Sequence, residues 1–106
     1  MNNFNDRERG FEAKYSFDLE QDFRIEAHLY KMLAVWAGEQ MGMAPADCDA
    51  YAKKVIGEVI ANPKENSIVT FLLADFGRNN IDVTVSTLQA KLEQLRPIAR
   101  AEMLAG

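Results

Sequence analysis

The feature that most constrains this chain is one run, residues 4–43, which has the pattern of a single long helix but changes character near Arg24. After Arg24, apolar residues recur at three- and four-residue steps on two adjoining stripes, as on a helix face that is buried in a core. The first stripe is Ala27, Tyr30, Ala34, Ala37 and Met41, and the second is Ile25, Leu29, Met32 and Trp36. A face this wide predicts that the second half of the helix lies inside a bundle.

The first part of the same run carries one narrow apolar stripe set among charges. The stripe consists of Phe4, Phe11, Tyr15, Leu19 and Phe23. Like charges four residues apart, such as Glu8 with Glu12, oppose an isolated helix by about a few tenths of a kcal/mol. A segment that gains little from folding alone but carries spaced rings is typical of one that orders against a partner. We therefore expect residues before about Phe17 to be mobile in the free protein.

Two shorter amphipathic helices are predicted next. The first starts at Pro45, because a proline is tolerated in the first turn of a helix, and ends at Asn62-Pro63. Its apolar residues are Cys48, Tyr51, Ala52, Val55, Ile56, Val59 and Ile60. The second starts at Asn66 or Ser67 and stops at Gly77. Its inward residues are Val69, Leu72, Leu73 and Phe76.

The last predicted helix begins between Thr84 and Ser86. Ser86 followed by Gln89 fits a reciprocal capping pair. Its inward stripe is Val85, Leu88, Leu92, Leu95 and Ala99. Pro97 interrupts this stripe, and because a proline removes a backbone hydrogen bond, we expect a bend there or a weaker helix beyond it.

These elements predict an all-α fold class: a small four-helix bundle with a long first helix and a mobile N-terminal arm. The arm comprises residues 1–18 and the bundle residues 19–106. Ile81 and Val83, in the link before the last helix, are expected to close one end of the core. Cys48 is the only cysteine, which excludes an intramolecular disulfide, and we expect it to pack as a small hydrophobe.

Composition and motifs argue against several functions. The net charge is −4 and no basic cluster occurs, so we expect neither nucleic acid nor an anionic membrane as a partner. No apolar run reaches the roughly 20 residues that span a bilayer, and no signal peptide is recognised, so we expect a cytoplasmic protein. There is neither a phosphate-binding Gly-rich loop nor a nucleophile elbow, so we expect no enzyme, no catalytic residue and no cofactor.

A metal site is not expected either. The carboxylate-bridged sites of helical bundles need inward Glu-x-x-His repeats on two helices, and His28 is the only histidine. We expect His28 to lie at the edge of the core as a polar residue with one partner.

Several segments together resemble the zeta-subunit family of alphaproteobacterial ATP synthase inhibitors. The N-terminal motif is the most specific part, namely Phe4-Asn5-Asp6-Arg7-Glu8 and Phe11-Glu12-Ala13-Lys14-Tyr15. Glu26-Ala27, Lys31, Trp36-Ala37 and Ala50-Tyr51-Ala52-Lys53 extend the resemblance over nearly the whole chain. The chain differs from the family pattern at Asn5, at His28-Leu29-Tyr30 and at Pro97.

The resemblance implies an inhibitor of ATP hydrolysis by F-type ATP synthase, whose N-terminal arm inserts at a catalytic subunit interface. The implied partner is the catalytic sector of that enzyme, at the cytoplasmic face of the inner membrane. The implied partner-binding residues are Phe4, Asp6, Arg7, Glu8, Phe11, Glu12, Lys14 and Tyr15. The alternative is a small-ligand or nucleotide-binding regulatory bundle with a pocket among Trp36, Tyr51 and neighbouring helices, which leaves adenine nucleotide open as a ligand.

Overall fold

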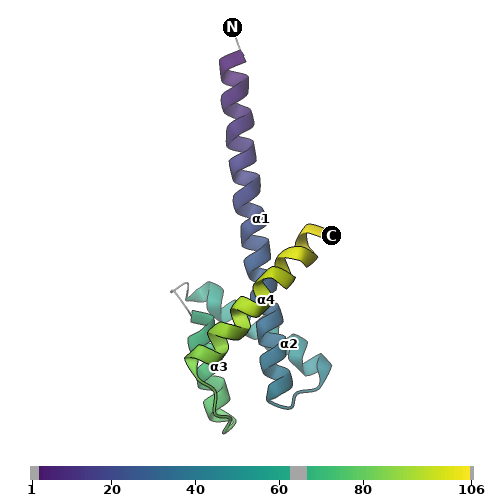
Figure 1. Ribbon diagram of the computed structural model, residues 1–106, viewed down its shortest axis with the longest axis vertical. Helices are drawn as coiled ribbons and strands as arrows, with labels where there is room; N and C mark the ends of the chain where they lie inside the picture. The colour runs from purple at the N-terminus through teal and green to yellow at the C-terminus, as the bar shows by residue number, and fades with distance from the viewer. Residues whose placement is uncertain (1–2, 63–66, 106) are drawn as a thin grey trace.

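The computed structural model describes the backbone of residues 3–62 and 67–105, and the side chains of residues 19–62 and 67–105. Its helices are α1 (Asn3–Gln40), α2 (Pro45–Ala61), α3 (Ser67–Arg78) and α4 (Val85–Ala105), and the described residues form no strand. The predicted all-α fold of four helices with a long first helix is confirmed (Figure 1). The mobility of residues 1–18 stays a prediction, because their side chains lie outside the described part of the chain.

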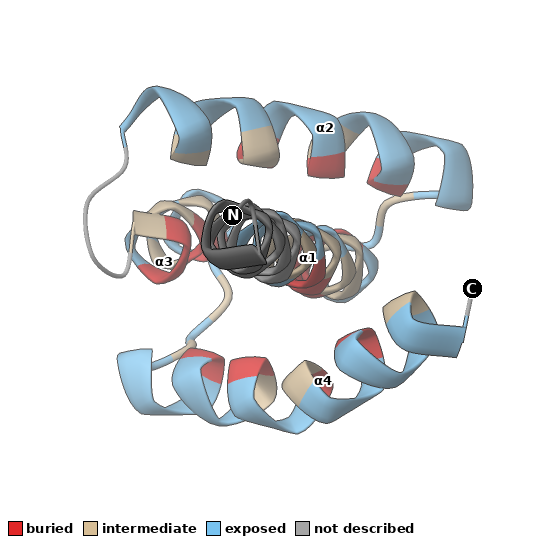
Figure 2. Ribbon diagram, turned by 90° about the horizontal axis from the view of Figure 1, so that it is seen from above, coloured by how far each residue is buried: buried red, intermediate tan, exposed pale blue. Residues whose placement is uncertain are grey.

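The second half of α1 is the centre of the bundle. α2 and α4 lie on opposite sides of it, and within the described residues no Cα atoms of α2 and α4 lie within 8 Å of each other (Figure 2). α1 contacts α2, α3 and α4. The first half of α1 extends past the other helices along the longest dimension of the molecule, 67 Å (Figure 1).

Most of the predicted apolar stripes are buried. The fully buried side chains of largest volume are Phe76, Leu29, Leu33, Leu72, Leu88, Val55, Val69 and Cys48. Leu33 is 0% exposed, although neither predicted stripe on α1 included it. Its four-residue spacing from Leu29 and Ala37 was a signal that would have placed it on the buried face. Ile81 and Val83 are half-buried and pack against the core, as expected for residues that close its end.

Two stripe residues were predicted to face inward but do not. Ile60 is 64% exposed and Val85 is 44% exposed. Ile60 belongs to the last turn of α2 and Val85 is the first residue of α4. Both apolar stripes therefore extend beyond the edge of the core. Periodicity alone does not show where that edge lies.

The helix ends are set by backbone conformation. Gly42 lies directly after α1 and has φ of 83°, and the Met43 N–H donates to the Gly38 carbonyl at 3.0 Å. The prediction that Gly77 ends α3 is wrong, because α3 continues to Arg78 and Asn80 adopts φ of 58° instead. Asparagine is among the few residues that tolerate this left-handed conformation.

α4 begins at Val85, within the predicted range of Thr84 to Ser86, but its capping residue differs from the prediction. The Thr84 hydroxyl accepts a hydrogen bond from the Thr87 N–H at 3.1 Å, so Thr84 caps α4 and Ser86 does not. α4 then continues through Pro97 to Ala105. Pro97 is exposed whereas Ala99 is fully buried, and Figure 2 shows α4 curving around α1. A proline on the outer side of a helix favours such a bend.

α1 packs closely on the start of α2 because Gly38 has no side chain. A Cβ atom at Gly38 would lie 3.0 Å from the Cys48 sulfur and 3.3 Å from the Met43 sulfur. Cys48 is 1% exposed, which confirms that it packs in the core. Its thiol therefore shares a tight contact with the backbone of α1.

We predict that Gly38→Val lowers the free energy of unfolding by about 1 to 3 kcal/mol, because the new methyl groups overpack this contact. Gly57→Val is the matched control, since nothing lies within 4 Å of a Cβ atom at Gly57. The control should change stability by less than about 0.5 kcal/mol. Urea denaturation of both variants measures the difference, and equal effects would contradict the close packing of α1 on α2.

Candidate partner-binding site

All of the predicted partner-binding residues lie in the part of α1 that extends past the bundle. They fall within residues 4–15 of α1. The contacts of these side chains are not tested, because they lie outside the described residues. The residues are Phe4, Asp6, Arg7, Glu8, Phe11, Glu12, Lys14 and Tyr15.

The described side chains begin at the base of this segment, where the narrow apolar stripe continues. Leu19 is 53% exposed and Phe23 is 66% exposed. Two residues later the core begins, with Ile25 at 7% exposure. At Leu19 and Phe23 the stripe is therefore uncovered up to the point where α1 enters the bundle, as its narrow width predicted.

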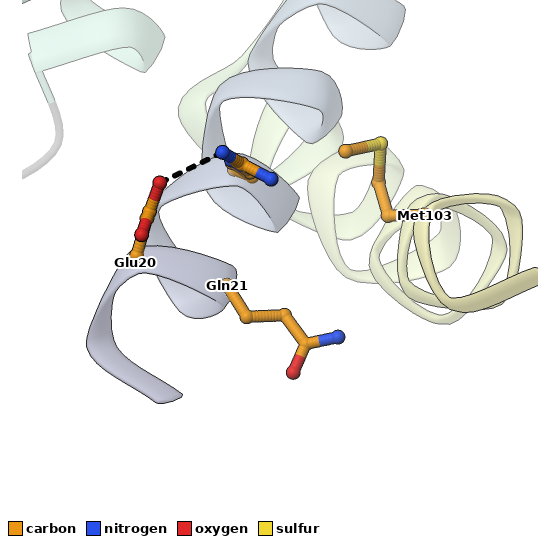
Figure 3. Close-up of a pocket in the computed structure, with 4 residues that line it drawn as sticks. Glu20, Gln21 and Met103 are labelled. Atoms are coloured by element: carbon orange, nitrogen blue, oxygen red, sulfur yellow. Dashed lines mark hydrogen bonds and ion pairs between the residues drawn. The ribbon is translucent and has the colours of Figure 1, made fainter. Parts of the chain in front are cut away.

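Beside this stripe, α1 and the end of α4 enclose a small hollow of about 170 Å³ (Figure 3). Its lining residues are Glu20, Gln21, Arg24 and Met103. Arg24 donates to the Glu20 carboxylate at 2.7 Å, one turn away on the same helix. Both side chains are more than half exposed, so this ion pair is worth about 0 to 1 kcal/mol. The hollow is smaller than the roughly 300 Å³ at which ligand pockets begin.

Two polar links join α4 to α1 just below the hollow. His28 Nε2 lies 2.6 Å from Glu102 Oε2, and Arg96 pairs with Glu26. Arg96 also lies 3.4 Å from the Glu93 carboxylate. The prediction that His28 borders the core with one polar partner is confirmed. Within the described part of the chain, no three His, Cys, Asp or Glu side chains are grouped so that they could hold a metal ion.

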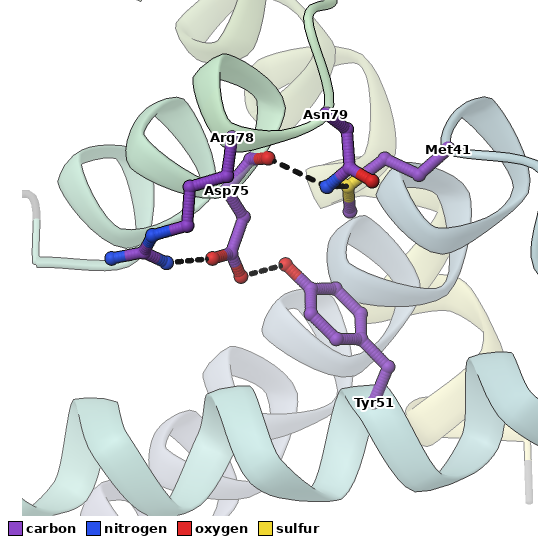
Figure 4. Close-up of polar contacts among 5 residues, drawn as sticks. All are labelled: Met41, Tyr51, Asp75, Arg78 and Asn79. Atoms are coloured by element: carbon purple, nitrogen blue, oxygen red, sulfur yellow. Dashed lines mark hydrogen bonds and ion pairs between the residues drawn. The ribbon is translucent and has the colours of Figure 1, made fainter.

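A second polar network joins α2 to α3 (Figure 4). The Tyr51 hydroxyl donates to Asp75 Oδ2 at 2.6 Å, and Arg78 pairs with the other oxygen of Asp75. The Asn79 amide donates to the Asp75 carbonyl at 2.8 Å and lies 3.2 Å from the Met41 sulfur. Burial, together with the hydrogen bond to Asp75 and its charge, raises the pKa of Tyr51 above its usual 10.0. Sequence reasoning missed Asp75 and Arg78, although their three-residue spacing was a signal for an ion pair.

A shallow hollow of about 260 Å³ lies beside Trp36, between α1 and α4. Its lining residues are His28, Lys31, Met32, Val35, Trp36, Glu39 and Leu95. The ring of Trp36 packs against Phe76, with centroids 6.0 Å apart, and Lys91 Nζ lies 5.3 Å from its centroid. Tyr51 does not line this hollow, because its hydroxyl is held between α2 and α3. The two aromatics of the predicted ligand pocket are therefore not brought together here.

Comparison with known families identifies the chain. The family described as ATPase inhibitor subunit zeta matches residues 1–102. The chain therefore belongs to the ATPase inhibitor subunit zeta family, which confirms the resemblance found in its sequence. Comparison with curated proteins and with solved structures gave no match. None of the described helices is long and apolar enough to cross a membrane.

We predict that Tyr51→Phe lowers the free energy of unfolding by about 1.5 to 3 kcal/mol near pH 8, because Asp75 loses a hydrogen bond made to a charged acceptor. Folded Tyr51 keeps its proton at a pH where unfolded tyrosine, with a pKa of 10.0, loses it. Its contribution is therefore full below pH 10 and decreases as the pH rises above it. The difference between parent and variant in urea denaturation should shrink above pH 10, and a difference that grows there would contradict this network.

Proposed function

We propose that this chain is a non-catalytic inhibitor of ATP hydrolysis by F-type ATP synthase, and that residues 1–18 act as an arm that enters an interface between catalytic subunits. One observation supports this proposal most strongly. In a chain of the ATPase inhibitor subunit zeta family, α1 continues as one helix far past the bundle that anchors it (Figure 1). On this proposal, residues 19–106 are the bundle that carries the arm.

The chemistry of the arm suits a wedge between subunits. Phe4, Phe11 and Tyr15 supply large apolar side chains, and burial of each is worth about 1.5 to 3 kcal/mol. The charges of the arm supply hydrogen-bonding groups of both signs for the walls of a cleft. They are Asp6, Arg7, Glu8, Glu12 and Lys14. Residues 3–18 of α1, at a rise of about 1.5 Å per residue, are about 24 Å long, which is enough to reach well into a subunit interface.

The arm would then inhibit by blocking a movement of the catalytic subunits. Catalytic subunits change shape during each hydrolysis cycle, so a rigid helix held between two of them opposes the movement. The arm needs no catalytic group of its own for this. The proposed place of action is the cytoplasmic face of the inner membrane, where the catalytic sector of the enzyme is exposed. No observation in the described residues adds support for the alternative, a nucleotide-binding bundle.

The direct test is ATP hydrolysis by the purified catalytic sector of the cognate ATP synthase, measured with and without the full chain. We expect the full chain to inhibit and a chain that lacks residues 1–18 to have no effect. The truncated chain should still melt cooperatively, because every buried residue that the described side chains contribute to the core lies at Ile25 or later. A truncated chain that inhibits as strongly as the full chain would place the active surface in the bundle and refute the proposal.

We further predict that Phe11→Ala raises the concentration needed for half-inhibition by at least about tenfold, because a buried ring contributes more than a rim charge. Glu8→Ala should have a smaller effect, since exposed ion pairs are worth about 0 to 1 kcal/mol. Neither variant should shift the melting temperature much. Dose–response curves beside melting curves measure both quantities, and a Phe11→Ala chain that inhibits like the parent would show that the ring is no anchor.

A further inference from the structure

We infer that the surface bound by the ATP synthase does not end with the arm but continues onto Leu19 and Phe23, which we call the arm-base surface. This inference rests on the proposed function and extends it. Its occupant is a part of the catalytic sector that presents an apolar recess beside a basic side chain. The start of the bundle would then contact the enzyme directly, in addition to the arm.

The first argument is the continuity of one helix face. Leu19, Phe23, Ala27, Tyr30, Ala34 and Ala37 follow one another on α1 at steps of four and three residues. Their exposure changes along this face. Ala37 and Ala34 are 0% exposed and Tyr30 is half-buried, whereas Phe23 is 66% exposed. The face that packs in the core thus continues outside it as uncovered apolar surface. In the other direction, Phe11 and Tyr15 continue the same four-residue row into the arm.

The second argument is charge. Asp22 is exposed beside Phe23 and makes no ion pair among the described residues. Glu20 and Glu26, by contrast, are paired with Arg24 and Arg96. The unpaired Asp22 carboxylate near the exposed Leu19 and Phe23 is complementary to a partner surface that is apolar and locally positive.

Leu19 and Phe23 alone are too small a surface to hold a second copy of the chain. A large aromatic side chain buries about 150 to 250 Å². Leu19 and Phe23 from two chains therefore supply well under the roughly 1,200 Å² of a stable interface. Two copies would also bring the Asp22 carboxylates near each other. The same small surface is sufficient as an addition to an interface that the arm already makes, since a few rings dominate such interfaces.

The test measures the dissociation constant between full-length chain and the purified catalytic sector of the cognate ATP synthase by biolayer interferometry. Phe23→Ala should raise it by about tenfold, the effect of losing one buried anchor. Ile60→Ala is the matched control, because Ile60 is similarly exposed, at 64%, but lies on α2. The control should stay within about twofold of the parent. Asp22→Lys should also weaken binding, and Glu58→Lys, an exposed carboxylate on α2, should not.

The outcomes separate this inference from the proposed function. If Phe11→Ala weakens binding but Phe23→Ala and Asp22→Lys do not, the arm acts alone and the arm-base surface is refuted. If neither Phe11→Ala nor Phe23→Ala weakens binding, the proposed function itself fails. Sedimentation of the free chain tests self-association: a concentration-dependent dimer that Phe23→Ala abolishes would assign this surface to a second copy and overturn the inference. Phe23→Ala should leave the melting temperature unchanged, because the ring is mostly exposed.

Discussion

The burial of the second half of α1 between α2 and α4 is the interaction on which the rest of the structure depends. The absence of a side chain at Gly38 allows α1 to pack closely on the start of α2. The buried surface of α1 includes Leu29, Leu33, Ala34 and Ala37, which are all 0% exposed. A helix held on both sides along its second half is a stiff support for its first half. The same helix thereby forms the centre of the bundle and carries the proposed binding segment.

The ion pairs and hydrogen bonds between α4 and α1 lie near Pro97 of α4. The half of α4 near Pro97 lacks one backbone hydrogen bond, and it is here that Arg96 and Glu102 bind Glu26 and His28 of α1. Each of these pairs is partly exposed and contributes modestly. Together they fix the end of α4 against α1 close to the point where α1 leaves the bundle. A partner that binds the proposed arm is therefore linked to the core of the bundle by the single continuous helix α1.

The sequence predicted the helices better than it predicted their ends. The change at Arg24 located the start of the core, which the structure places at Ile25, because wide and narrow apolar stripes have different packing needs. Asn80, and not Gly77, adopts the left-handed conformation at the end of α3, since both residue types tolerate it and only the path of the chain decides. Thr84 caps α4 for a similar reason, as several hydroxyl residues compete there.

The candidate site, too, was predicted only in part from the sequence. The arm was predicted from residue motifs and a family resemblance, and of these the family is confirmed, over residues 1–102. Contacts between distant residues, such as Tyr51 with Asp75 or His28 with Glu102, were beyond prediction because periodicity assigns a face but no partner across helices. The exposure of Ile60 was likewise hidden, since a stripe of apolar residues does not show where its neighbouring helices end.

The central claim is that the N-terminal half of α1, and not the outer side of the bundle, lies inside the ATPase. Site-specific photocrosslinking tests this most directly, with a benzophenone side chain placed at position 11 in one chain and at position 58, on the exposed side of α2, in another. We predict that the probe at position 11 forms crosslinks to catalytic subunits of the cognate ATP synthase and that the probe at position 58 forms none. Crosslinks from position 58 alone would contradict the account.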